Sequence, residues 1–119
     1  MAQHNELGSK GEKEAIKFLQ QLGYKILETN YRYIKHEVDI IAEFENQLIV
    51  VEVKTRSTRY FGDPQDFVKP TQIKSIVTAV NAFIEERDID LEVRFDIIAV
   101  TSIKGKLEIE HIPDAFLSF

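Results

Sequence analysis

The pattern of apolar and polar residues divides the chain into two helical and five extended segments. Apolar residues three or four positions apart predict one helix over 6–22 and a second from residue 70 or 71 to about 86. Gly23 stands where a glycine commonly ends a helix. Extended segments are predicted at 24–30, 37–44, 47–54, 92–101 and 105–112. The order α-β-β-β-α-β-β indicates an α/β domain with a central mixed β-sheet of about five strands flanked by helices.

Composition narrows the protein class. The 119 residues are enough for one domain with a hydrophobic core, so we expect a single domain over 1–119. The sequence has no cysteine, which excludes disulfides, thiolate catalysis and cysteine-bound zinc. The longest apolar run, Leu48–Val51, is far shorter than the roughly 20 residues of a membrane span. The N-terminus lacks the apolar stretch of a secretory signal. We therefore expect a cytoplasmic protein without membrane association.

Charge is unevenly distributed. The net charge of −5 argues against a general nucleic-acid coat protein, which is usually basic. Segment 54–74 nevertheless holds five basic and two acidic residues, and segment 85–96 holds six acidic and two basic ones. A locally basic stretch inside an acidic protein can still meet a phosphate backbone. Arg56, Arg59, Lys69 and Lys74 are candidate phosphate contacts, and a solvated basic surface is the alternative.

The strands 37–44 and 47–54 form a hairpin whose register follows from their apolar positions. Each strand has one fully apolar face, made of Val38, Ile40 and Ala42 in the first and Ile49, Val51 and Val53 in the second. Packing both faces on one core pairs 38 with 53, 40 with 51 and 42 with 49, because a slip by one residue would expose one set. A turn centred on Glu45-Asn46 gives the same register.

The opposite face of this hairpin carries the candidate chemistry. The register places Asp39 opposite Glu52, and Glu37 opposite Lys54, with opposed Cβ atoms about 4.5–5.5 Å apart. Like charges directly opposed destabilise a sheet, so the pair of carboxylates predicts a compensating cation. Mg²⁺ and Mn²⁺ prefer such oxygen ligands. The purely structural alternative is a ladder of ion pairs on a solvated sheet edge. For Glu37, an ion pair with Lys54 is slightly favoured over metal binding.

A metal held in this way can activate water for attack on a phosphodiester, while Lys54 stabilises charge on the phosphate. Asp39, twelve intervening residues and then Glu52-Val53-Lys54 resemble the D…(D/E)xK signature of the restriction-endonuclease-like nucleases. The resemblance extends to the YraN family through motifs spread over most of the chain: Gly11-Glu12, Gly23-Tyr24, Asn30, 37–42, 51–56, Phe61-Gly62 and 94–96.

The YraN family is bacterial and has an endonuclease-like fold similar to that of archaeal Holliday-junction resolvases. The resemblance implies that Asp39, Glu52 and Lys54 form the catalytic core and that Glu12 is a further ligand of Mg²⁺ or Mn²⁺. It also implies a DNA substrate, with branched or structured DNA favoured. Resolvase-like action on two strands would need a symmetric homodimer. The chain departs from the family at His36, where glycine is usual, and at Gln72, where a basic residue is expected among the nucleic-acid contacts.

Two further carboxylates have competing interpretations. Ser9 and Glu12 fit a helical capping box, in which Glu12 would only satisfy a backbone amide. A helix that begins near Asn5 would instead place Glu12 in mid-helix, facing the hairpin, with Gly11 permitting close approach to the sheet. Asp96 shares a strand face with Arg94, so it forms either an internal ion pair or a contact supporting the site.

These observations leave three functional hypotheses. The first is a divalent-metal-dependent nuclease that hydrolyses phosphodiester bonds in DNA. The second is a nucleic-acid-binding module that has the nuclease fold without turnover of its own. The negative net charge and the absence of a basic residue at Gln72 support it. The third is a protein-interaction domain that uses the acidic segment 85–96. Salt-dependent DNA binding separates the first two from the third, and cleavage separates the first from the second.

Overall fold

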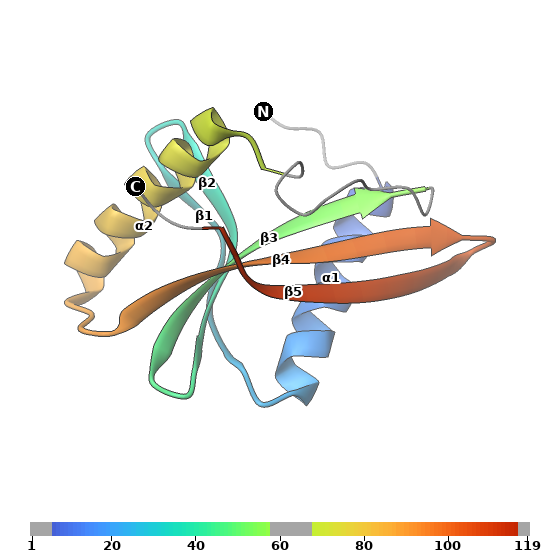
Figure 1. The fold of residues 1–119 in the computed structure, drawn as a ribbon, viewed down its shortest axis with the longest axis horizontal. Helices are drawn as coiled ribbons and strands as arrows, with labels where there is room; N and C mark the ends of the chain where they lie inside the picture. The colour runs from blue at the N-terminus through green and yellow to red at the C-terminus, as the bar shows by residue number, and fades with distance from the viewer. Residues whose placement is uncertain (1–5, 58–67, 117–119) are drawn as a thin grey trace.

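A computed structural model of the protein describes residues 6–57 and 68–116. The described residues form two helices and five strands in the predicted order (Figure 1): α1 (Glu6–Gln21), β1 (Lys25–Tyr33), β2 (His36–Phe44), β3 (Gln47–Arg56), α2 (Pro70–Arg87), β4 (Glu92–Ile103) and β5 (Lys106–Phe116). The predicted fold class is confirmed. Strands β1 and β5 run further than predicted, to Tyr33 and Phe116. Neither described helix is long and apolar enough to cross a membrane.

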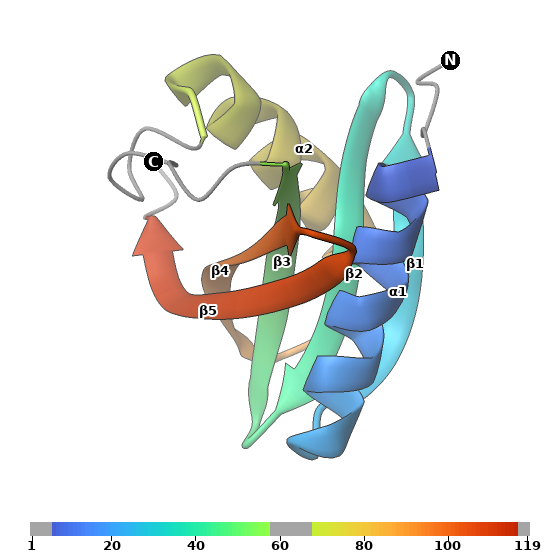
Figure 2. The same ribbon diagram turned by 90° about the vertical axis from the view of Figure 1, so that its right-hand side faces the viewer.

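The five strands form one mixed sheet in the order β1-β2-β3-β4-β5. Strands β3 and β4 are parallel, and the other neighbours are antiparallel. Because a parallel pair needs a crossover connection, α2 passes over one face of the sheet between β3 and β4. Helix α1 covers the opposite face (Figure 2). The central strand β3 is therefore buried on both sides, which explains its continuous apolar run.

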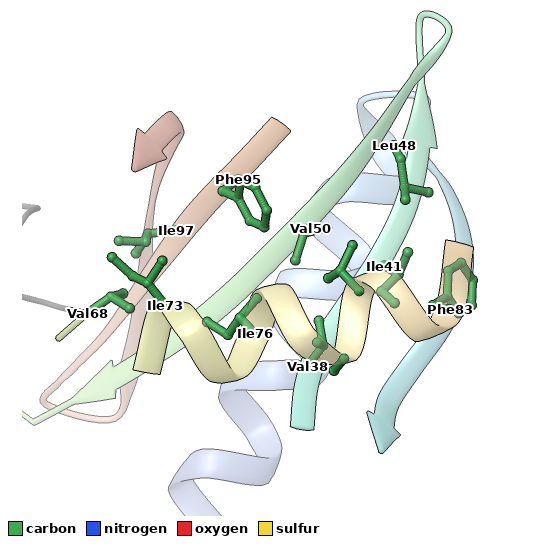
Figure 3. Packing of buried hydrophobic residues seen from close by; sticks show 12 residues of the cluster. Val38, Ile41, Leu48, Val50, Val68, Ile73, Ile76, Phe83, Phe95 and Ile97 are labelled. Carbon is green, nitrogen blue, oxygen red and sulfur yellow. The ribbon is translucent and has the colours of Figure 1, made fainter. Parts of the chain in front are cut away.

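Two hydrophobic clusters fill the spaces between the sheet and its helices. Figure 3 shows the first, in which Ile73, Ile76 and Phe83 of α2 pack on the sheet. The second joins Ala15 and Leu19 of α1 to the other face. Residues next to each other along β2 and β3 alternate between the clusters, for example Ile40 and Ile41. The two helices thereby fix the position of β3 from both sides.

The predicted register of the hairpin is confirmed in its inner part and wrong at its open end. Ile40 pairs with Val51 and Ala42 with Ile49, but the ladder between β2 and β3 ends at Ile40. Beyond it, β2 stays paired with β1 and β3 stays paired with β4 as far as Arg56. The two strands separate because each follows its other neighbour (Figure 2). Asp39 and Glu52, like Glu37 and Lys54, therefore do not form ladder pairs.

The alternation of side chains along β2 is also broken at Asp39. Val38 lies in the cluster on the α2 side together with Ile41, whereas Ile40 lies on the α1 side. Strict alternation would place Val38 and Ile40 on one face. The prediction that they share a face is therefore wrong. The irregularity coincides with the point at which β2 leaves β3.

Gly11 allows α1 to lie close to the end of β3. A Cβ atom at this position would clash with the hydroxyl of Thr55, and the predicted close approach is confirmed.

We expect Gly11→Ala to lower the free energy of unfolding by about 1–3 kcal/mol, although alanine is the better helix former by about 1 kcal/mol. The replacement should be far less harmful beside Thr55→Ala, which removes the clashing atoms. Urea unfolding of the four proteins of this double-mutant cycle measures the difference, and an equal effect in both backgrounds would contradict the packing.

Candidate active site

A cavity of about 510 Å³ lies at the end of the sheet where β2 and β3 separate. Four elements contribute to it: α1, the start of β2, the end of β3 and the start of α2. Its polar side chains include four carboxylates, two lysines, a glutamine and a serine: Glu12, Glu37, Asp39, Glu52, Lys35, Lys54, Gln72 and Ser75. The structure thus brings together the residues predicted to form the catalytic core, together with Glu12.

Asp39 occupies the gap between the separating strands. Its Oδ2 accepts a hydrogen bond of 2.8 Å from the backbone N–H of Val53. A carboxylate of β2 thereby replaces the backbone carbonyl that would otherwise accept this bond, as short acidic side chains commonly do. The side chain is held against β3 in a fixed position next to Glu52. The separation of β2 from β3 therefore creates the gap in which the side chain of Asp39 is held.

Glu52 is a buried carboxylate of β3, with 5% of the residue exposed. Its Oε1 accepts a hydrogen bond of 3.3 Å from Nε2 of Gln72, while Oε2 is buried without a hydrogen-bond partner in the described structure. Lys54 donates to Oε1 of the same glutamine at 3.3 Å. Gln72 therefore lies between the buried carboxylate and the lysine and holds both.

Burial and mutual repulsion disfavour the charged forms of the two carboxylates. Burial raises the pKa of Asp39 to about 6, the bond from Val53 opposes this shift, and the nearby charge of Glu12 adds to it. Burial and the neighbouring Asp39 raise the pKa of Glu52 well above its usual value. One positive charge near both groups would reverse these effects, since an opposite charge favours the ionised form.

The donor set fits a hard divalent cation. Glu52 Oε2 is an unsatisfied buried oxygen, and Asp39 brings a second carboxylate beside it. Among the described residues no group of three acidic or histidine side chains is close enough to form a complete cage. Mg²⁺ does not need such a cage, because it is usually held by one or two carboxylates together with waters and substrate phosphates. The residues present are therefore suitable for Mg²⁺ or Mn²⁺.

Glu12 lies on the cavity side of α1. The helix already includes Glu6, so Ser9 is inside the helix and cannot be its N-cap. The capping-box interpretation of Glu12 is therefore wrong. Glu12 lines the cavity, and its charge contributes to the raised pKa of Asp39. It approaches the carboxylate pair from the face of the sheet opposite to α2.

Glu37 was interpreted as a partner of Lys54, and Asp96 as either an ion-pair partner or a contact supporting the site; only Glu37 lines the cavity. Glu37 lines the cavity, but the ladder between β2 and β3 ends at Ile40, so its predicted position opposite Lys54 is wrong. Asp96 is fully buried in a different network. Its carboxylate binds Arg94 at 2.8 and 2.9 Å and His111 at 2.8 Å. The internal ion pair is thus the interpretation that the structure supports for Asp96.

Of the candidate nucleic-acid contacts that the structure describes, only Gln72 lines the cavity. Arg56 is exposed at the end of β3 and donates to the carbonyl of Thr55. Lys69 and Lys74 are exposed at the start of α2. Arg59 lies outside the described residues. Their contact with phosphate remains a prediction.

Two cavity residues were not identified from the sequence. Lys35 lies in the turn before β2, and Ser75 lies one helical turn after Gln72, where its Oγ is 2.7 Å from Nδ1 of His36. The spacing of Gln72 and Ser75, three residues apart on one helix, was the available signal for Ser75. Lys35 gave no such signal, because a lysine in a turn is usually a solvated surface residue.

Comparison with known sequences places these residues in a family. Residues 11–100 match the model of a family described as "Uncharacterised protein family UPF0102". A UPF0102 protein of Christiangramia forsetii is 60% identical over 119 residues, covering both chains completely. A UPF0102 protein of Phocaeicola vulgatus is 46% identical over 116 residues, covering 98% of this chain and 96% of its own. The chain therefore belongs to family UPF0102, the YraN family whose motifs its sequence resembles.

Proposed function

We propose that this protein is a divalent-metal-dependent nuclease that hydrolyses phosphodiester bonds in DNA, with branched or structured DNA as the favoured substrate. The observation that carries the proposal is the carboxylate pair Asp39 and Glu52, which shares a polar cavity with Lys54 and includes an unsatisfied buried oxygen. A buried acid beside a second, half-buried acid does not stabilise the fold by itself. Their arrangement suits a cation and the phosphate that accompanies it.

Asp39 and Glu52 would hold the metal ion, and Glu12 of α1 would add negative charge to the same cavity. When bound, the ion supplies a water of lowered pKa and neutralises charge on the phosphate. The chain's own residues supply position and charge. The bond from Val53 fixes Asp39, and Gln72 fixes Glu52 and Lys54 relative to each other. Lys54 stabilises the negative charge that develops on the phosphate during attack.

Cleavage assays on linear, flapped and four-way-junction DNA test the proposal, with Mg²⁺ and then Mn²⁺ at low salt. We expect metal-dependent cutting that Glu52→Gln lowers by at least about 100-fold, because it removes a charged ligand while keeping the shape. Glu110→Gln is the matched control: it makes the same chemical change at an exposed position of β5 and should cut normally.

Two outcomes would contradict the nuclease. Binding that weakens as salt rises, without cutting by any metal, would indicate the nucleic-acid-binding module. If the protein neither binds nor cuts DNA, the carboxylate pair is only an inherited feature of the fold.

Symmetric incision of a junction further requires a homodimer. Light scattering of the protein with and without the junction measures this stoichiometry.

A further inference from the structure

We propose that the turn between β1 and β2 is a wedge that separates stacked bases of nucleic acid bound at the carboxylate cavity. The proposal rests on the proposed function and adds how the substrate would be distorted. The turn consists of Ile34 and Lys35, and its tip is the side chain of Ile34. Apolar side chains such as isoleucine are used in this way by proteins that unstack and kink DNA.

The backbone of Ile34 has an unfavourable conformation for its residue type. Its φ is +60°, a region that β-branched residues rarely adopt. The β4–β5 hairpin uses Lys104 and Gly105 at positive φ, and the β2–β3 hairpin uses Glu45 and Asn46. The β1–β2 turn thus places a strained residue where glycine or asparagine would fold more easily.

The side chain of Ile34 gains nothing from the fold in return. It is 76% exposed, the largest exposure among the large hydrophobic residues of the described chain. Strain and exposure both act against the isolated protein. Strained residues that the surrounding structure maintains are concentrated at functional sites, which makes an external contact the physical explanation for Ile34.

The position of the turn next to the cavity indicates which molecule Ile34 would contact. Lys35 lines the carboxylate cavity, so Ile34 stands at the rim of the candidate active site. In Figure 2 the turn lies at the same end of the molecule as the start of α1, which carries Glu12 into that cavity. A backbone bound over the carboxylates would therefore bring its bases within reach of the tip.

The charge around the tip suits the phosphate backbone of nucleic acid. The segment 29–36 contains Arg32 and Lys35 and no acidic residue, although the whole chain has a net charge of −5. Both basic residues are exposed, and Tyr33 beside them is 39% exposed. An apolar tip between two cations matches bases between phosphates.

The experiment uses the full-length protein, EDTA to prevent cutting, and a four-way DNA junction carrying 2-aminopurine next to the branch point. Unstacking of this base raises its fluorescence. We expect the wild-type protein to raise the signal and Ile34→Asn to abolish the rise and weaken binding about tenfold, as loss of one buried apolar side chain implies. Asparagine tolerates positive φ, so the variant should melt at the same temperature or a few degrees higher.

Leu22→Asn is the matched control, because Leu22 is a 51% exposed apolar residue just beyond the C-terminal end of α1. It should leave the fluorescence change intact. Metal-dependent cutting by the wild-type protein with no fluorescence change would overturn the wedge while the nuclease stands. Absence of DNA binding both in EDTA and with Mg²⁺ would overturn both. A wild-type dimer that Ile34→Asn converts to a monomer would assign the tip to a second copy of the chain and overturn the wedge.

Discussion

Asp96→Asn is expected to lower the free energy of unfolding by about 3–5 kcal/mol, because it removes one partner of a buried ion pair. The carboxylate of Asp96 is fully buried, and it accepts bonds from Arg94 and from the backbone N–H of Asp114. Arg94 also donates to the hydroxyl of Tyr24, so the network joins β4 to the residue just before β1. An uncharged residue at position 96 leaves the partly buried guanidinium of Arg94 without its counterion.

The pH dependence of stability provides a second signature of this network. Burial by itself would raise the pKa of Asp96, but the bonds from His111, Arg94 and Asp114 outweigh burial and hold the pKa below its usual value. Stability from a lowered pKa is present above the unfolded value of about 3.9 and is lost as pH falls through the folded value. The difference between the wild type and Asp96→Asn should therefore shrink in acid.

Urea unfolding at pH 7 and at about pH 3 measures both effects. The control is Glu28→Gln, which removes the negative charge from the exposed ion pair of Glu28 with Arg87 at 2.9 Å. That pair has nearly the same length but is open to solvent, so its loss should cost less than about 1 kcal/mol. Equal losses at the two sites would mean that burial does not set the strength of the Asp96 network.

The inner hairpin shows how much of the site the sequence could predict. The pairing of Ile40 with Val51 followed from two apolar faces and one turn, and it is correct because register is strongly specified where side chains are buried. The separation after Ile40 could not be predicted in this way. It depends on β3 having β4 as a second partner and on Asp39 bonding to the backbone of Val53.

Gln72 illustrates a second limit of the sequence. It was predicted as a nucleic-acid contact because a basic residue is expected there by resemblance. In the structure it bonds to both Glu52 and Lys54. No spacing along the chain indicates this, because α2 reaches β3 only through the crossover to a parallel strand. The identity of the acidic residues was predictable, whereas the group that positions them depended on the fold.

Asp39→Asn is expected to stabilise the metal-free protein at pH 7–8 by about 1–3 kcal/mol, since a pKa displaced by about two units corresponds to at most about that much. Burial raises the pKa of Asp39 to about 6, so the folded state binds its proton more tightly than the unfolded state. This contribution is fully present below the unfolded pKa of about 3.9 and is lost as pH rises through about 6. Asparagine remains uncharged and can still accept the bond from Val53.

Urea unfolding in EDTA from pH 4 to pH 8 should show the wild type losing stability relative to Asp39→Asn, with equal stability at the acidic end. Adding Mg²⁺ at pH 8 should then stabilise the wild type more than the variant, because a ligand that binds only the folded state adds stability. A variant that is less stable than the wild type in EDTA at pH 8 would contradict the unfavourable ionisation of Asp39 in the folded protein. If the expected result is found, the carboxylates reduce the stability of the fold, and their presence is explained by the cation they bind.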